Sequence, residues 1–138
     1  SAVSRGLGDV YKRQALLLKN FSKKLDKTKF SVFVNLSARV GSITDNSLGG
    51  WISYRSSKAA LNQIIKTSSI EINRRNKNAI CVGLHPGTVK TSFTEKFQNT
   101  TETISPDESV KMMMNVVENL SVDDNGYCFA YDGKVIPA

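Results

Sequence analysis

The chain has 138 residues and a formal net charge of +7, with 40% apolar and 22% charged residues. This composition is typical of one ordinary globular domain, long enough to form a hydrophobic core. No apolar run reaches the roughly 18 residues that a membrane span needs, and no charged-then-apolar leader opens the sequence. We therefore expect a cytoplasmic protein with no membrane partner.

The positive charge and the cysteines point to no particular ligand. The basic residues are dispersed or lie in two short clusters without interleaved aromatic residues, which argues against nucleic acid as a partner. Cys81, Cys128 and the single histidine, His85, lack the spacing of a zinc site or a disulfide framework. We expect no metal site.

The first stretch, residues 1–14, reads "SAVSRGLGDVYKRQ" and shows no hydrophobic period. Its Gly6-Leu7-Gly8 follows no strand and lacks a third glycine, so it is weak evidence for a phosphate-binding loop. The stretch resembles the translated junction sequence found at broken gene ends. We expect residues 1–14 to be non-native and leave them out of the fold argument, which concerns residues 15–138.

From Ala15 onwards, apolar residues recur at helical spacing as far as residue 25, which predicts a helix that ends at the lysine-rich turn over residues 26–29. "FSVFVNLS", from Phe30, is apolar on both faces and predicts a strand covered on both sides. A loop rich in glycine, serine, aspartate and asparagine follows over residues 39–50. The spacing of apolar residues then predicts a helix over residues 51–73.

"AICVGL", residues 79–84, predicts a second buried strand that ends at His85-Pro86-Gly87. A polar loop follows to residue 104. "SPDE" then predicts a helix with Ser105 as N-cap, Pro106 at the first position and Glu108 completing a capping box. "GYCFAYDGKVIP" indicates a strand, a tight turn at Asp132-Gly133 and a short return.

The alternation of helices and strands predicts an α/β fold: the C-terminal part of a doubly wound, Rossmann-type parallel sheet, with about three strands and flanking helices. Ligands of such sheets bind beyond the carboxyl ends of the strands. Here those ends are residues 37–41 and 85–88. Tyr54 lies near the start of the helix that follows residues 37–41.

Tyr54 and Lys58 lie four positions apart, which places them on one helical face. A phenol normally titrates near pH 10, and a nearby ammonium favours its charged form, so the pair is suited to acid/base chemistry. In isolation, the same spacing also fits ordinary packing and solvation.

Three motifs occur in order: "NLSARVGSI" after one strand, "YRSSKAALN" in the helix, and "GLHPGTVKT" after the next strand. Together they resemble the short-chain dehydrogenase/reductase superfamily, and the loop "ARVGSITDNSLGGWISYRSSKAALN" is most similar to its C-factor-like and sniffer-like branch. The resemblance covers residues 15–138.

The resemblance implies a role for each matching residue. Tyr54 is expected to be the general acid in carbonyl reduction or the base in alcohol oxidation, and Lys58 to hold the nicotinamide ribose and lower the pKa of Tyr54. The cofactor is expected to be NAD or NADP and the substrate a small carbonyl or alcohol. The nicotinamide and nearby phosphate are expected to bind at Pro86, Gly87, Val89 and Thr91, beneath a mobile flap over residues 91–104.

One residue departs from the family pattern. The family usually has two serines after the strand, the second orienting the substrate oxygen, whereas this chain has Ser37 followed by Ala38. Ser42 or Ser37 is left to supply the hydroxyl, with Ser42 slightly favoured because adjacent strand residues face opposite ways. If neither reaches the substrate, activity is expected to be reduced or absent.

Residues 15–138 contain no glycine-rich dinucleotide loop of the kind that the family carries on its first strand. We therefore expect the isolated chain to bind nicotinamide cofactor weakly or not at all and to aggregate through its uncovered edge. The residue that separates NAD from NADP lies outside the chain as well. A homo-oligomer is expected for the full-length protein, since the 51–73 helix commonly forms the subunit contact in this superfamily.

The leading interpretation is thus part of an NAD(P)-dependent oxidoreductase that transfers hydride between nicotinamide and a carbonyl or alcohol. The alternative is a non-catalytic signalling or interaction protein that retains the fold, which the alanine after Ser37 and the C-factor-like loop keep open. A basic nucleic-acid-binding module is a third interpretation, disfavoured by the dispersed charge.

Overall fold

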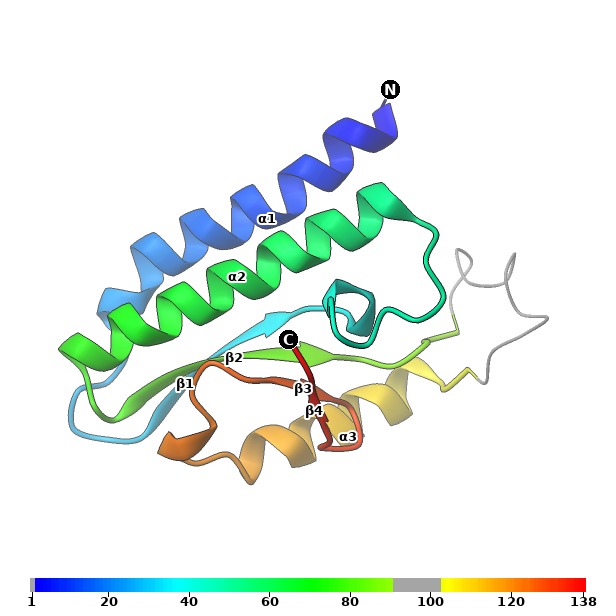
Figure 1. The fold of residues 1–138 in the computed structure, drawn as a ribbon. Helices are drawn as coiled ribbons and strands as arrows, with labels where there is room; N and C mark the ends of the chain where they lie inside the picture. Colours follow the sequence, from blue (N-terminus) through cyan, green and yellow to red (C-terminus); the bar gives the residue numbers. More distant parts are fainter. Residues whose placement is uncertain (1, 91–102) are drawn as a thin grey trace.

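The computed structural model describes residues 2–90 and 103–138 as helices on both sides of one small sheet (Figure 1). In chain order the elements are α1 (Ala2–Phe21), η1 (Ser22–Lys24), β1 (Ser31–Leu36), η2 (Arg39–Gly41), α2 (Ile52–Arg75), β2 (Ala79–His85), α3 (Pro106–Glu118), η4 (Val122–Asp124), β3 (Cys128–Ala130) and β4 (Val135–Ile136).

The sheet has the strand order β1-β2-β3-β4. The first three strands are parallel, and β4 returns antiparallel to β3. The return confirms the predicted turn at Asp132-Gly133, where Gly133 adopts a φ of +83°. Within the described residues β1 pairs with β2 alone, so its other edge is open.

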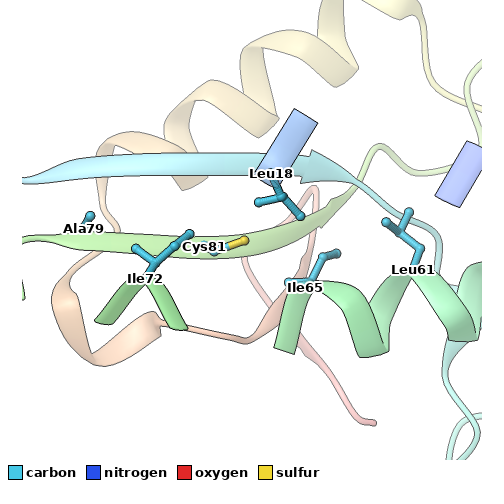
Figure 2. Close-up of a cluster of buried hydrophobic side chains, with 6 residues drawn as sticks. All are labelled: Leu18, Leu61, Ile65, Ile72, Ala79 and Cys81. Atoms are coloured by element: carbon cyan, nitrogen blue, oxygen red, sulfur yellow. The ribbon is translucent and has the colours of Figure 1, made fainter. Parts of the chain in front are cut away.

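One face of the sheet is covered by α1 and α2, which lie side by side, and the other face by α3 (Figure 1). Beneath α1 and α2, one core cluster joins a side chain of α1 to three of α2 and two of β2 (Figure 2): Leu18, Leu61, Ile65, Ile72, Ala79 and Cys81. These six side chains are almost completely shielded from solvent.

The second core cluster lies beneath α3 and takes the alternate residues of β2: Ile80, Val82 and Leu84 pack with Val116 and Phe129. Successive residues of a strand point to opposite faces, so β2 supplies both clusters. This double burial explains why its sequence is an unbroken apolar run, and it confirms the prediction of a buried strand over residues 79–84. The strand predicted to be covered on both sides, β1, is only partly buried, and its last residue, Leu36, is 54% exposed.

The predicted fold class is therefore confirmed, with differences at the ends of helices. Residues 2–21 form one continuous helix, so α1 also includes most of the stretch that the sequence argument set aside. The helix expected to end at the turn over residues 26–29 ends earlier: α1 stops at Phe21, η1 follows, and Leu25 is already extended, with φ −62° and ψ 138°. The expectation that residues 1–14 are non-native stays a prediction.

Helix α3 begins at the predicted residues, with only the Ser105 half of the predicted capping box in place. Pro106 is its first residue, and the side chain of Ser105 accepts a hydrogen bond of 3.2 Å from the backbone N–H of Glu108. A reciprocal capping box forms at η4 between Ser121 and Asp124. Across residues 2–90 and 103–138, none of the helices combines the length and apolar character needed to span a bilayer.

Candidate active site

The carboxyl ends of β1 and β2 lie at one edge of the sheet, and α2 begins near that edge (Figure 1). The strands are joined beyond their last pair by a bond of 2.9 Å from the N–H of Ser37 to the carbonyl of Leu84. The two predicted strand-end segments are thereby neighbours, as the parallel arrangement requires.

Tyr54 and Lys58 lie on one face of the first turns of α2, with the Nζ atom of Lys58 5.9 Å from the centroid of the Tyr54 ring. The Tyr54 side chain is 36% exposed, and Lys58 is half-buried. A phenol that can be reached from solvent, beside a shielded ammonium, is an arrangement able to give and take a proton.

The start of α2 is set by three consecutive residues with positive φ: Gly49 at +65°, Gly50 at +72° and Trp51 at +50°. Glycine adopts this conformation at little cost, whereas a residue with a Cβ is strained there. Trp51 is the N-cap residue, so the strain lies three residues before Tyr54.

Arg55 holds this left-handed loop against the helix. Its guanidinium donates to the carbonyl of Gly49 at 3.2 and 3.3 Å, to that of Gly50 at 3.1 Å and to that of Val40 at 3.5 Å. The planar guanidinium presents several donors in a fixed fork, which lysine lacks. The sequence analysis did not single out Arg55, because a cation bound to backbone carbonyls leaves no charge pattern to detect.

Gly41, the last residue of η2, brings the loop after β1 into contact with α2. A Cβ at this position would lie 2.7 Å from the backbone carbonyl carbon of Lys58 and 2.9 Å from the side-chain nitrogen of Asn62. Only glycine permits so close an approach. The position of Lys58 is therefore fixed from the side of the loop as well as from the helix.

The two serines predicted as candidates are both buried and both engaged. The Ser37 hydroxyl donates to Oδ1 of Asn62 at 2.5 Å, which ties the end of β1 to α2. The Ser42 hydroxyl accepts from the N–H of Asp45 at 2.9 Å and donates to the carbonyl of Ala138 at 3.4 Å. Among the described residues neither serine hydrogen-bonds to Tyr54, so a substrate-orienting role for Ser42 or Ser37 stays a prediction.

Burial shifts the pKa values of the pair in opposite directions. Loss of solvation raises the pKa of Tyr54 above its ordinary value of 10.0 and lowers the pKa of Lys58 below 10.5. The implied lowering of the Tyr54 pKa by Lys58 stays a prediction, because the net shift in the chain as described here is set by desolvation. The ammonium lies toward the ring face, and desolvation of the phenolate dominates.

His85, the last residue of β2, lies at the same edge. Burial and the neighbouring positive charges of Arg39 and Lys58 lower its pKa to about 4, so its imidazole is neutral at pH 7. Its buried Nδ1 has no hydrogen-bond partner among the described residues. The sequence analysis considered His85 only as a metal ligand, and a single histidine carried no other signal.

The predicted cofactor segment follows His85. The carbonyl of Pro86 accepts a bond of 2.6 Å from the Ser109 hydroxyl of α3, and Gly87 takes a φ of +79° with the Tyr131 ring beside it. Val89 pairs with Ile104 in an isolated bridge that closes the base of the polar loop. Thr91 and residues 91–102 of the predicted flap lie outside the described residues.

In the part of the chain that the structure describes, no group of three or more histidine, cysteine, aspartate or glutamate side chains could hold a metal ion. Cys81 and Cys128 are free thiols, and burial raises the pKa of Cys81 to about 12. Neither thiol is therefore activated as a nucleophile at neutral pH.

Comparison with known proteins identifies relatives among oxidoreductases. An uncharacterized oxidoreductase of Schizosaccharomyces pombe is 34% identical over 88% of this chain and 52% of its own length. The C-signal protein of Myxococcus xanthus is 33% identical over 75% of this chain and 58% of its own length. The chain thus spans about half the length of the curated relatives it matches. No family model matches the chain.

The solved structures most relevant to this chain are also those of oxidoreductases. An NADPH-bound carbonyl reductase from chicken fatty liver superposes with a TM-score of 0.76 at 34% identity, covering 97% of this chain and 57% of that one. The carbonyl reductase Sniffer of Drosophila melanogaster gives a TM-score of 0.70 at 30% identity, covering 88% of this chain and 48% of that one. These likenesses confirm the resemblance to the C-factor-like and sniffer-like branch of the superfamily and the Rossmann-type fold.

Proposed function

We propose, starting from this kinship with the short-chain dehydrogenases/reductases, that the chain supplies the proton-transfer part of an NAD(P)-dependent oxidoreductase acting on a small carbonyl or alcohol. The observation that carries the proposal is the Tyr54–Lys58 pair, with Nζ 5.9 Å from the ring centroid at the carboxyl-end edge of a parallel sheet. Residues 15–138 are then the C-terminal half of a dehydrogenase domain.

The residues at this edge fit a nicotinamide cofactor. Within the described residues the Lys58 ammonium forms no ion pair, and Nδ1 of His85 has no partner, so donors and acceptors are available to a polar ligand. Lys58 would hold the ribose hydroxyls, and the backbone from Pro86 to Val89, with Thr91, would hold the carboxamide and phosphate. The likeness to an NADPH-bound carbonyl reductase supports this assignment. When bound, the cofactor supplies or accepts the hydride.

In reduction, the Tyr54 phenol donates its proton to the carbonyl oxygen while the carbonyl carbon gains a hydride. The carbonyl becomes an alcohol, and Tyr54 is left as a phenolate that regains its proton from solvent through its exposed side. The positive charge of Lys58 stabilises that phenolate. Oxidation of an alcohol runs the same transfer in reverse, with the phenolate as the base.

The raised pKa of Tyr54 gives the two directions different pH profiles. The phenol stays protonated at and above neutral pH, so it is ready as an acid for reduction, whereas oxidation needs the phenolate. We expect reduction to be flat through neutral pH and oxidation to rise as the pH approaches the phenol pKa. Initial rates in both directions across that range test this expectation.

The open edge of β1 supports the proposal that the whole enzyme has further strands beside it. The missing dinucleotide loop would come with those strands, together with the residue that selects NAD or NADP. We propose that the isolated chain is inactive, binds nicotinamide weakly and aggregates through this edge. Saturable, tight binding of NADPH by the isolated chain would contradict the proposal.

The decisive experiment replaces Tyr54 by phenylalanine in the full-length protein. Loss of the phenolic proton is expected to lower carbonyl reduction by roughly 10²–10⁴-fold, the usual contribution of a general acid. NADPH oxidation is followed with a panel of small aldehydes and ketones. Tyr127→Phe is the matched control, since Tyr127 lies against Phe129 on β3 and is half-exposed. Unchanged turnover in Tyr54→Phe would overturn the proposal.

A second candidate function is signalling or interaction without turnover. The similarity to the C-signal protein and the alanine at position 38 favour it. Under this alternative Tyr54→Phe and Tyr127→Phe leave the biological activity equally intact. The same pair of variants therefore separates the two functions.

A further inference from the structure

We propose that His85, at the carboxyl end of β2, is a further catalytic residue, whose imidazole N–H hydrogen-bonds the carbonyl oxygen of the substrate beside Tyr54. This role rests on the proposed function, because it belongs to the same site. Tyr54 still supplies the proton, and His85 holds the oxygen to which that proton is transferred.

His85 lies on the side of the sheet that α2 covers. The even-numbered residues of β2 from 80 to 84 pack beneath α3, whereas Ala79 and Cys81 pack with α1 and α2. Successive strand residues face opposite ways, so His85 follows Ala79 and Cys81 toward α2. The imidazole is therefore on the inner side of α2, and a subunit contact on the outer side of that helix would not cover it.

His85 is also near the proton-transfer pair. A Cβ on Gly83 would lie 3.2 Å from the side chain of Ile65 in α2. Because α2 and β2 run in opposite directions (Figure 1), the residue two positions further along β2 lies nearer the start of α2. His85 is accordingly within electrostatic reach of the Lys58 ammonium, whose Nζ is 5.9 Å from the centroid of the Tyr54 ring.

The hydrogen-bonding capacity of His85 is unused in the part of the chain that the structure describes. Its Nδ1 is buried there without a partner, whereas the hydroxyls of Ser37 and Ser42 are both engaged. A buried polar atom without a partner destabilises a fold, so its retention at a site favours a functional role. His85 as a whole is only half-buried, and rotation about its Cβ–Cγ bond exchanges the two edges of the ring, so a donor can be presented to a ligand.

The imidazole of His85 is suited to donate a hydrogen bond and to keep its proton. Burial and the positive charges of Arg39 and Lys58 lower its pKa to about 4, against the smaller opposing effect of Asp132. The ring is therefore neutral at pH 7 and carries one N–H. A neutral imidazole can polarise a carbonyl by donating this N–H.

The reaction offers His85 an acceptor. A carbonyl oxygen has two lone pairs, and the Tyr54 phenol uses one of them when it gives its proton. An N–H of His85 fits the other, which would hold the oxygen in place for that transfer and stabilise the negative charge that develops on it. In this step Tyr54 loses its proton to the oxygen, the carbon gains the hydride, and His85 keeps its own proton.

The substrate is favoured over the cofactor as the partner of His85. The proposed nicotinamide site uses the Lys58 ammonium and the backbone from Pro86 to Val89, and it needs no side chain at position 85. The neutral imidazole also brings no charge with which to bind a phosphate. A contact with the cofactor, or with a segment outside the described residues, is an outcome of the test.

The test is made in the full-length protein with the panel of small aldehydes and ketones. His85→Phe keeps a ring and removes both nitrogens, and we expect kcat to fall at least about tenfold with the Kd for NADPH unchanged. His85→Gln and His85→Asn each keep an N–H near the place of one of the ring nitrogens. At least one of them should be about fivefold or more faster than His85→Phe.

The matched control is Cys81→Ala, on the same strand and the same face as His85. Cys81 lies four residues earlier, about 13 Å from the edge at roughly 3.3 Å per residue, and its side chain is buried in the core cluster. The kcat of this variant, corrected for the folded fraction, should stay within about twofold of wild type, because distant sites act independently.

A vibrational measurement detects the hydrogen bond without turnover. The carbonyl stretching frequency of isotope-labelled cyclohexanone falls with each hydrogen bond to its oxygen. Bound with NADP⁺ to the full-length Tyr54→Phe protein, the ketone should keep a lowered frequency, because His85 remains as a donor. The lowering should be lost in Tyr54→Phe/His85→Phe and kept in Tyr54→Phe/Cys81→Ala.

The role of His85 would be overturned by an unchanged kcat in His85→Phe, by equal losses in all three His85 variants, or by a carbonyl frequency that His85→Phe leaves unchanged. A rise in the Kd for NADPH as large as the loss of kcat/KM would also overturn it, since it would indicate a contact with the cofactor. Failure of the proposed function is a separate result, namely unchanged turnover in Tyr54→Phe. In that case the carbonyl frequency still shows whether the imidazole binds a ketone.

Discussion

The two halves of α2 are built in different ways. The first turns, with Tyr54 and Lys58, are held by loop backbone: by Arg55 on three carbonyls and by Gly41 against Lys58. The later turns are held by side-chain packing, with Leu61, Ile65 and Ile72 buried at the sheet. One helix therefore separates the positioning of the proposed proton-transfer pair from stabilisation of the fold.

The largest expected effect comes from the packed half. Ile65 is fully buried, so Ile65→Ala should lower the free energy of unfolding by about 2–5 kcal/mol. Chemical denaturation followed by circular dichroism measures this loss. Ile70→Ala, on the same helix but half-exposed, is the control and should cost less than half as much. Equal losses in the two variants would contradict the division of α2.

A pH-dependent loss of folding stability is expected from His85, which ends β2 near the first turns of α2. The pKa of His85 is lowered from 6.5 to about 4, so between these values the unfolded chain binds a proton that the folded chain does not. The contribution of neutral His85 to the free energy of unfolding is therefore fully present above pH 6.5. It falls as the pH drops toward 4, by at most about 1.4 kcal/mol per pH unit.

His85→Asn should flatten this slope, as measured by the unfolding free energy at several pH values. Asp26 and Asp132 also titrate, but their pKa values are lowered from 3.8, so their stabilisation is lost only at lower pH. A slope that survives in His85→Asn between pH 6.5 and 4 would show that another group is responsible.

A smaller effect on stability, with a larger one on activity, is expected at Gly41. A methyl group there would meet the Lys58 backbone at 2.7 Å, so Gly41→Ala should cost about 1–3 kcal/mol and displace Lys58. Gly49→Ala is the contrasting control, since its added Cβ meets nothing within 4 Å and only backbone strain of about 1–2 kcal/mol remains. Gly41→Ala should lose carbonyl reduction out of proportion to its stability.

The smallest effect is expected at Ser37, where the two halves of α2 meet. Ser37→Ala removes the bond to Asn62 and should cost about 0.5–1.5 kcal/mol. If the hydroxyl serves structure alone, kcat follows the folded fraction. If Ser37 orients substrate, kcat falls further in Ser37→Ala than in Ser42→Ala at equal folded fraction.

The sequence predicted the secondary-structure elements that form the core better than the contacts around Tyr54 and Lys58. Apolar runs and helical spacing located β1, β2, α2 and α3 to within a few residues, because burial on two faces leaves an unbroken pattern. Tyr54 and Lys58 were found because their spacing of four is itself a local signal.

The contacts that position the pair left no such signal. Gly41 approaches Lys58 across 17 positions of sequence, and Arg55 binds backbone carbonyls that every residue type carries. Ser37 and Ser42 were both candidates from the sequence, and only the folded chain shows the bonds in which each is engaged. Long-range backbone contacts of this kind depend on tertiary structure and not on composition or period.

The left-handed stretch before α2 has a consequence for how the site can diversify. Because Arg55 fixes the carbonyls of Gly49 and Gly50, the start of the helix does not depend on the side chain of Leu48, which is 92% exposed. Leu48 could therefore be exchanged without moving Tyr54. An exposed position beside the proposed proton donor is the kind of place where a change of side chain can alter which molecules reach a site without altering its chemistry.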